Sequence, residues 1–145
     1  MKTGVLLDSG PLVAYFCARE NFHDWAVEIL ASLGSPIVTC EPVLTEACFL
    51  LARNGLQAAR VLEPLERGRL VIGIRVEEEL GAIRTLMERY ANVPMSLADA
   101  CLVRLTEMTG LPVCTLNSDF SIYRAHRRRA LNLISPVPTG GLHEP

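Results

Sequence analysis

The fold of this chain is decided by KTGVLLDSGPLVAYF, residues 2–16. A short apolar run from Val5 to Leu7 ends on an acid, Asp8, and after Pro11 the apolar residues follow helical spacing. This pattern predicts a buried parallel strand that leads into a helix with the proline in its first turn. Ligands of open α/β sheets bind beyond the carboxyl ends of the strands, so Asp8 is a candidate site residue. It is also a typical turn former and helix cap, and at this point both interpretations stay open.

The 145-residue chain is 50% hydrophobic and carries a formal net charge of −2. This length and composition fit one globular domain and disfavour disorder. No apolar run approaches the roughly 20 residues of a membrane span, and Asp8 interrupts the N-terminal run. We therefore expect a cytoplasmic protein without a signal peptide or membrane segment. The negative net charge gives no general attraction to nucleic acid, so contact with phosphates would need a local basic cluster or bound cations.

The five cysteines are odd in number and lack CxxC spacing. Most lie inside apolar runs, which is typical of reduced, buried thiols in cytosolic proteins. Zinc sites and disulfide frameworks are therefore disfavoured.

Strand and helix patterns alternate along the rest of the chain. Further strands are predicted at 36–40, 70–74, 113–116 and 131–134. Helices are predicted at 21–33, 42–53, 56–65 and 77–90, and between the cap Ser96 and the stop Gly110. In the helix at 77–90, three glutamates are expected in the first turn and Leu80 is expected to point inward. Strand, helix and strand in succession predict a right-handed crossover and a parallel sheet. Residues 1–135 are expected to form a single domain and residues 136–145 a flexible tail.

Four polar clusters follow a predicted strand or begin a predicted helix: Asp8, Glu46, Asp99 and residues 117–119. In a doubly wound sheet these ends meet at one edge, so side chains far apart in the sequence become neighbours. The structural alternatives are a solvated acid near a helix N-terminus for Glu46 and a turn for 117–119. For Asp99 the alternative is a variant of the capping box with Ser96.

Carboxylates gathered in one crevice repel each other unless they share a cation. Hard oxygen ligands suit Mg²⁺ or Mn²⁺, which can activate water for attack on a phosphodiester. Because the metal activates water, no side chain is needed as the nucleophile. None looks placed for that role either: the three histidines lie outside the polar clusters, and neither GxSxG nor HExxH occurs. The acids therefore point to metal-dependent hydrolysis.

The four clusters lie in segments that resemble the PIN domain, the metal-dependent ribonuclease fold of the VapC toxins of toxin-antitoxin pairs. These segments are LLDSGPLVAYF (6–16), TEACFLL (45–51), SLADACLV (96–103) and TLNSDFSIYR (115–124), and the resemblance covers nearly all of the chain. It implies a three-layer α/β/α sandwich with a mostly parallel central sheet of four to five strands. It also implies an endoribonuclease that cuts RNA with Mg²⁺ or Mn²⁺, a homodimer, and a small antitoxin whose C-terminal segment covers the acidic crevice.

Position by position, the resemblance makes Asp8, Glu46 and Asp99 the first three acids of the family. It implies that Asp8 and Asp99 are the principal metal ligands and that Glu46 positions water or metal. The place of the fourth acid, in a T-x-D-x-x-F pattern, is taken by Asn117, which brings no charge and would hold a second metal less tightly. Asp119 is the candidate substitute, and one well-held cation is expected. The residues expected to orient the acids are Ser9, Thr115, Asn117 and Ser118.

The segment YRAHRRR, residues 123–129, is strongly basic. It follows the fourth cluster directly, so Arg124, Arg127 and Arg128 are candidate RNA contacts. A charge run is more often a solvated face, and that alternative stays open. A second function also stays open, a degenerate PIN domain that binds RNA or protein without cutting. Asn117 favours that alternative, and the three retained acids oppose it.

Overall fold

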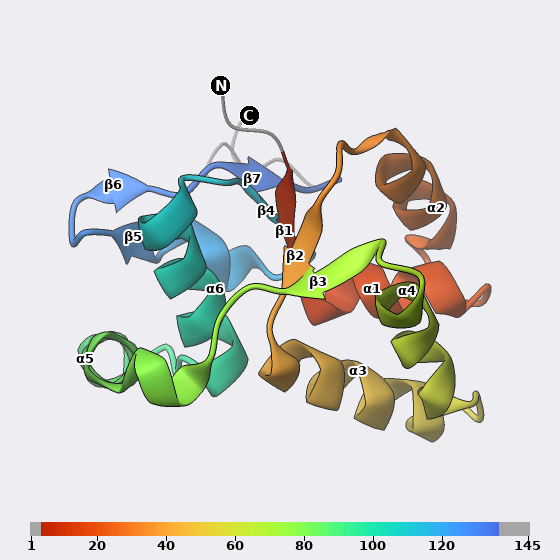
Figure 1. Cartoon of the computed structure of the whole chain (residues 1–145), viewed down its shortest axis with the longest axis horizontal. Helices are drawn as coiled ribbons and strands as arrows, with labels where there is room; N and C mark the ends of the chain where they lie inside the picture. The colour runs from red at the N-terminus through yellow and green to blue at the C-terminus, as the bar shows by residue number, and fades with distance from the viewer. Residues whose placement is uncertain (1–3, 137–145) are drawn as a thin grey trace.

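The computed structural model describes residues 4–136 and contains a five-stranded parallel sheet (Figure 1). The strand order is β3-β2-β1-β4-β7. The strands are β1 (Val5–Leu7), β2 (Ile37–Thr39), β3 (Leu70–Ile72), β4 (Val113–Cys114) and β7 (Leu133–Ile134). Each neighbouring pair is parallel. The predicted α/β class, the parallel pairing and the number of strands are therefore confirmed.

Helices cover the sheet on both sides, which gives the predicted three-layer sandwich (Figure 1). In that view α5 and α6 lie to the left of β1, and α1 to α4 lie to the right and below. The α-helices are α1 (Ser9–Phe16), α2 (His23–Ser32), α3 (Glu41–Arg53), α4 (Glu63–Glu66), α5 (Leu80–Arg89) and α6 (Leu97–Thr109). Short 3-10 turns are η1 (Ala58–Leu62), η2 (Val76–Glu78) and η3 (Ser118–Ser121).

Strand β1 lies at the centre of the sheet, and its three residues are at most 2% exposed. A strand that is covered on both faces needs apolar side chains on both, which explains a continuous apolar run without alternation. The neighbouring strand β2 buries one polar side chain, Thr39. Its hydroxyl donates to the carbonyl oxygen of Leu7 at 2.7 Å, so the buried hydroxyl is satisfied.

The order in which successive strands are added to the sheet changes direction at β1. Strands β2 and β3 lie on one side of it, and β4 and β7 lie on the other. The chain therefore leaves the carboxyl ends of β1 and β4 toward different sides and opens a crevice between them. Ligands of doubly wound sheets bind at such a switch point.

The prediction of a continuous helix at 56–65 is wrong in part. The segment forms the 3-10 turn η1 followed by the single short helix α4. Pro64 has no N–H, and its ring would clash with the carbonyl group four residues earlier, so a continuous helix cannot pass through it. The proline lies instead in the first turn of α4, where its missing donor costs nothing.

The helix predicted at 77–90 begins only at Leu80. Arg75 forms ion pairs with Glu77 at 2.9 Å and with Glu78 at 3.3 Å. These two acids therefore lie in a 3-10 turn, paired to an arginine, and not in the first helical turn. Leu80 is 59% exposed and does not point inward, because it is the first residue of the helix and not part of its buried face.

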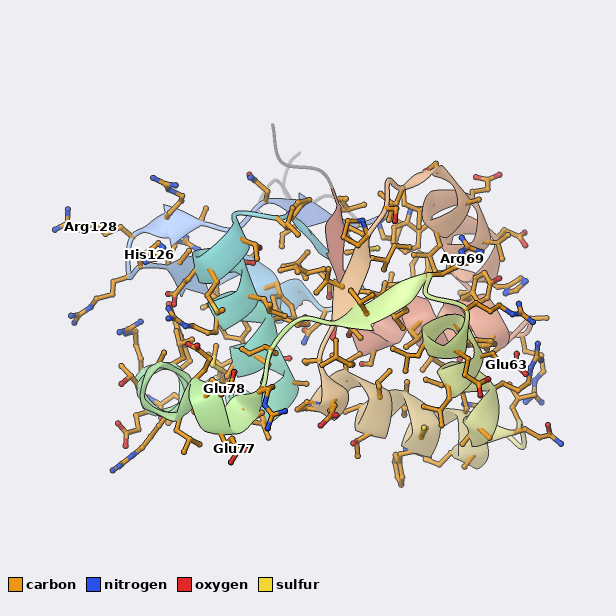
Figure 2. All side chains as sticks on the ribbon, in the orientation of Figure 1. Glu63, Arg69, Glu77, Glu78, His126 and Arg128 are labelled. Atoms are coloured by element: carbon orange, nitrogen blue, oxygen red, sulfur yellow. The ribbon has the colours of Figure 1, made fainter. Side chains whose placement is uncertain are left out.

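An antiparallel hairpin of β5 (Arg124–Ala125) and β6 (Arg129–Ala130) was not predicted. The two central residues of its turn, His126 and Arg127, have φ values of 51° and 71°. Such left-handed turns normally contain Gly or Asn, so the basic segment carries no turn signal in its sequence. Figure 2 shows the tip of this hairpin extending away from the sheet.

In the part of the chain that the structure describes, no helix is long and apolar enough to cross a membrane. All five cysteines are free thiols, and four of them are buried. Of the predicted flexible tail, residues 137–145 lie outside the described part of the chain.

Candidate active site

The four polar clusters of the sequence meet at the switch point of the sheet. They line a crevice of about 420 Å³ beyond the carboxyl ends of β1 and β4. Its lining residues are Asp8, Ser9, Gly10, Glu46, Pro94, Ser96, Asp99, Leu116, Asn117 and Asp119. The crevice thus gathers acids from four separate segments of the chain.

Asp8 is the N-cap of α1 and is only 4% exposed. Its Oδ1 accepts the N–H of Ser9 at 2.8 Å, and its Oδ2 accepts the hydroxyl of Thr115 at 2.7 Å. Burial raises the pKa of Asp8 from its ordinary value of 3.8 to about 6, although these two hydrogen bonds oppose the rise. The negative charges of Asp99 and Glu46 raise it further, by smaller amounts. Asp8 is therefore both a helix cap and a carboxylate that is costly to ionise.

Glu46 lies on α3, half-buried, and lines the crevice. Its Oε1 accepts the hydroxyl of Ser9 at 3.0 Å. Burial raises the pKa of this carboxyl, with a further contribution from the charge of Asp99. The interpretation of Glu46 as a freely solvated acid is therefore wrong, because its side chain is held at the crevice beside two other acids.

Asp99 lies in the first turn of α6 and is 7% exposed. Its backbone N–H donates to the hydroxyl oxygen of Ser96 at 3.0 Å, so Ser96 is the N-cap as predicted. Its carboxylate oxygen Oδ2 accepts the phenolic hydroxyl of Tyr123 at 2.7 Å. The N-cap contact uses the backbone of Asp99, and its carboxylate bonds Tyr123, so only the Ser96 half of the capping box is formed and the side chain lines the crevice.

The fourth cluster contributes an amide and one more acid. Asn117 and Asp119 both line the crevice, whereas Ser118 does not line it. The Oδ1 of Asn117 accepts the N–H of Asp119 at 2.9 Å and caps η3, which is the turn interpretation of this cluster. The hydroxyl of Thr115, which donates to Asp8, accepts the N–H of Asn117 at 2.9 Å. Asn117 therefore supports the turn at the edge of the crevice and supplies no charge.

Tyr123 is the site residue that the sequence did not reveal. It is fully buried, and burial together with its hydrogen bond to Asp99 raises the pKa of its phenol, so it stays protonated as a donor. A tyrosine that precedes a basic run carries no recognisable site signal, and its partner lies 24 residues away. Each of the three acids accepts one side-chain hydroxyl: Asp8 from Thr115, Glu46 from Ser9, and Asp99 from Tyr123.

The donor set of the crevice fits a hard divalent cation. Within residues 4–136, no three His, Cys, Asp or Glu side chains converge closely enough to hold an ion by themselves. Mg²⁺ does not need such a cage, because it usually keeps several waters and takes one or two protein carboxylates. A cation beside Asp8 would also offset the cost of ionising that buried group. Asp8 and Asp99 are the best-placed ligands, because both are buried and held by hydrogen bonds.

Comparisons with known proteins agree with this arrangement. The model of the PIN domain family matches residues 5–125. A solved structure with a similar fold is VapC20 of Mycobacterium tuberculosis, described as a sarcin-ricin loop cleaving toxin, with a TM-score of 0.70. The two sequences are 23% identical, and the match covers 81% of this chain and 93% of that one. A search of curated proteins gives no match. Since the family model spans most of the sequence, including all four polar clusters, the chain belongs to the PIN domain family.

Proposed function

We propose that this protein is a metal-dependent endoribonuclease and the toxin of a toxin-antitoxin pair. The observation that carries the proposal is the convergence of Asp8, Glu46 and Asp99 in one crevice, each held by a hydroxyl donor. Membership of the PIN domain family and a fold shared with a toxin that cleaves the sarcin-ricin loop support it.

Each residue of the crevice has its own role in the proposed reaction. Asp8 and Asp99 would hold Mg²⁺ or Mn²⁺, which would supply activation of water and neutralise charge on the scissile phosphate. Glu46 lines the crevice, and its second carboxylate oxygen would position water or the metal. Asp119 adds negative charge at the position where Asn117 brings none. Thr115 and Ser9 keep the acids in place through their hydroxyls.

The test is cleavage of end-labelled transfer and messenger RNA by purified protein with Mn²⁺, Mg²⁺ or a chelator. We expect cutting with either ion and none with the chelator, and the fragment ends would identify the RNA sites. A folded protein that binds these RNAs but leaves them intact with both ions would support the second candidate, a degenerate PIN domain. The observation that favours that candidate is the uncharged Asn117 at the edge of the crevice.

We propose that the β5–β6 hairpin binds the phosphate backbone of the RNA. Arg127, Arg128 and Arg129 are exposed, and within residues 4–136 no carboxylate forms an ion pair with any of them. In Figure 2, Arg128 lies at the outer end of the hairpin and points away from the sheet. Unpaired arginines on a projecting hairpin can meet phosphates without first breaking ion pairs.

Arg124, the remaining candidate RNA contact, has a structural role in the stem of the hairpin. The two hydrogens of its Nη1 are shared among three successive backbone carbonyl oxygens, those of Ser121, Ile122 and Tyr123, at 2.9, 3.2 and 2.9 Å. We therefore assign Arg124 to support of the hairpin and keep Arg127 and Arg128 as the RNA contacts.

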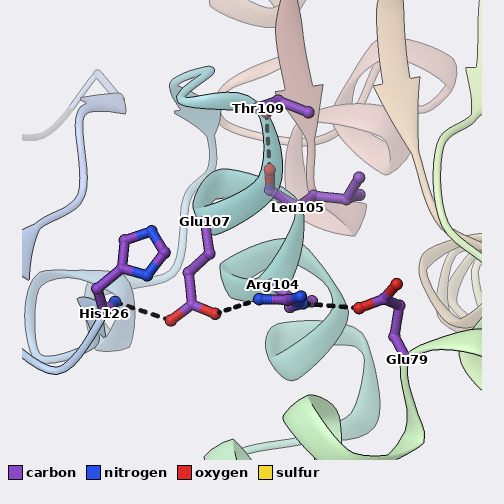
Figure 3. Close-up of polar contacts among 6 residues, drawn as sticks. All are labelled: Glu79, Arg104, Leu105, Glu107, Thr109 and His126. Carbon is purple, nitrogen blue, oxygen red and sulfur yellow. Dashed lines mark hydrogen bonds and ion pairs between the residues drawn. The ribbon is translucent and has the colours of Figure 1, made fainter.

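The tip of the hairpin is fixed to the helix that carries Asp99. The backbone N–H of His126 donates to Oε2 of Glu107 at 2.8 Å, and Arg104 donates to the other oxygen of Glu107 at 3.2 Å (Figure 3). Arg104 also pairs with Glu79 at 2.8 Å, which ties α6 to the start of α5. These contacts hold His126 in its unfavourable left-handed conformation. A hairpin that is already ordered loses less entropy when it binds RNA.

Replacing Arg127 and Arg128 together by alanine is expected to weaken RNA binding and its dependence on salt. Two lost phosphate contacts would lower the slope of log affinity against log salt by about 1.5. Binding is measured over a range of salt concentrations in the presence of a chelator, so that the RNA stays intact. The matched control replaces Arg75 and Arg84, which are exposed arginines outside the hairpin. They form ion pairs with Glu77 and Glu88. A slope equal to that of the unchanged protein would show that Arg127 and Arg128 do not contact RNA phosphates.

We also propose a homodimer and a small antitoxin as partners. A second hollow of about 220 Å³ lies between α1, α2 and α4, with apolar walls that include Leu12 and Leu30. Arg60, Arg67, Arg69 and Glu63 line it as well. Glu63 pairs with Arg60 at 3.9 Å, so the lining keeps a net positive charge that suits an amphipathic segment with acidic residues. Light scattering tests the dimer. Co-expression with the product of an adjacent short reading frame tests the antitoxin, which should suppress RNA cleavage.

A further inference from the structure

We infer that Tyr123 is a positioning residue of the metal site, whose hydroxyl sets the orientation of the Asp99 carboxylate. The inference rests on the proposed function of the crevice. The phenolic O–H donates to Oδ2 of Asp99 at 2.7 Å, and Tyr123 is fully buried. This bond uses one of the acceptor sites of Oδ2, so Oδ1 is the oxygen of Asp99 with more capacity left for a cation.

The tyrosine ring is held rigidly enough to fix that orientation. It packs edge-on against Tyr90 at 5.0 Å and against Phe120 at 5.2 Å between ring centroids. Phe120 is fully buried as well, so the ring of Tyr123 cannot swing away without opening the core. A hydrogen bond from a fixed hydroxyl to a charged carboxylate is stronger than one between neutral groups.

Tyr123 completes a pattern that the other two acids already show. Thr115 holds Asp8 and Ser9 holds Glu46, each through a single hydroxyl. Asp99 has its backbone fixed by Ser96, but that contact does not restrain the rotation of its carboxylate. Partners that orient a ligating carboxylate typically contribute 10- to 100-fold to metal affinity. The hydroxyl of Tyr123 donates a side-chain hydrogen bond to this carboxylate, so it is the group from which that contribution is expected.

The test removes this hydroxyl alone and compares it with a matched hydroxyl in the same aromatic cluster. Tyr123→Phe keeps the ring and its packing. Tyr90→Phe is the control, because the hydroxyl of Tyr90 accepts the backbone N–H of Arg124 at 3.0 Å and is not bonded to Asp99. Mn²⁺ affinity is measured by calorimetry on the unloaded proteins, kcat and KM are measured with labelled RNA, and urea unfolding checks that both variants are folded.

We expect Tyr123→Phe to weaken Mn²⁺ binding by about tenfold or more and to lower kcat at saturating Mn²⁺, with KM for RNA unchanged. Tyr90→Phe should bind Mn²⁺ as the unchanged protein does. Equal Mn²⁺ affinity in Tyr123→Phe and the unchanged protein would overturn the inference, and so would an equal loss in both variants, since that would indicate general loosening of the cluster. If the unchanged protein neither binds Mn²⁺ nor cuts RNA, the proposed function fails together with this inference. If it does both and Tyr123→Phe matches it, only the role of Tyr123 fails.

Discussion

Asp99→Asn is expected to reduce metal-dependent RNA cleavage by at least about a hundredfold without unfolding the protein. Asparagine has the size of aspartate, and its backbone N–H can still donate to Ser96, so the start of α6 keeps its cap. Its side-chain oxygen can still accept the hydroxyl of Tyr123. The change therefore removes the charge of one of the two proposed metal ligands and little else.

The rate is measured under single-turnover conditions with saturating RNA and a range of Mn²⁺ concentrations. A matched control is Asp24→Asn, because Asp24 also lies in the first turn of a helix but is exposed and outside the crevice. It should cut RNA at the unchanged rate. Cleavage by Asp99→Asn at the rate of the unchanged protein would mean that Asp99 does not take part in catalysis.

The location of the crevice could be predicted from the sequence because its signals are local. Asp8 follows directly on a buried apolar run, so it marks the carboxyl end of a strand. Asp99 follows a helix cap, so it marks the start of a helix. Parallel strands place such ends at one edge of the sheet whatever the sequence between them. The structure brings Asp8, Glu46 and Asp99 to that edge as expected.

The contacts that orient the acids could not be predicted in the same way. Tyr123 reaches Asp99 only because the chain returns over α6 after η3, and nothing in the residues around it indicates that return. The hairpin was missed for a related reason. Its left-handed residues, His126 and Arg127, are stabilised by a tertiary contact with Glu107 and not by their own conformational preference.

Asp8→Asn is expected to stabilise the metal-free protein at neutral pH while it removes metal binding. The pKa of Asp8 is raised from 3.8 to about 6 by folding, chiefly through burial. Between these two values the folded state holds a proton that the unfolded state has lost, so stability falls as the pH rises through this window. Above pH 6 both states are ionised, and the full cost of about 3 kcal/mol is present. Asparagine carries no such cost and is itself a good helix cap, although it cannot accept both hydrogen bonds that Asp8 accepts.

The free energy of unfolding is measured in urea with a chelator at several pH values from 4 to 8. We expect the advantage of Asp8→Asn over the unchanged protein to grow by about 2 kcal/mol from pH 4 to pH 7, which corresponds to a growth of roughly 8 °C in the difference between their Tm values. Saturating Mn²⁺ should reverse the order, because it stabilises only the protein that can bind it. A stability difference that does not change with pH would show that Asp8 ionises in the folded protein without penalty. That result would contradict the idea that a bound cation offsets the cost of ionising Asp8.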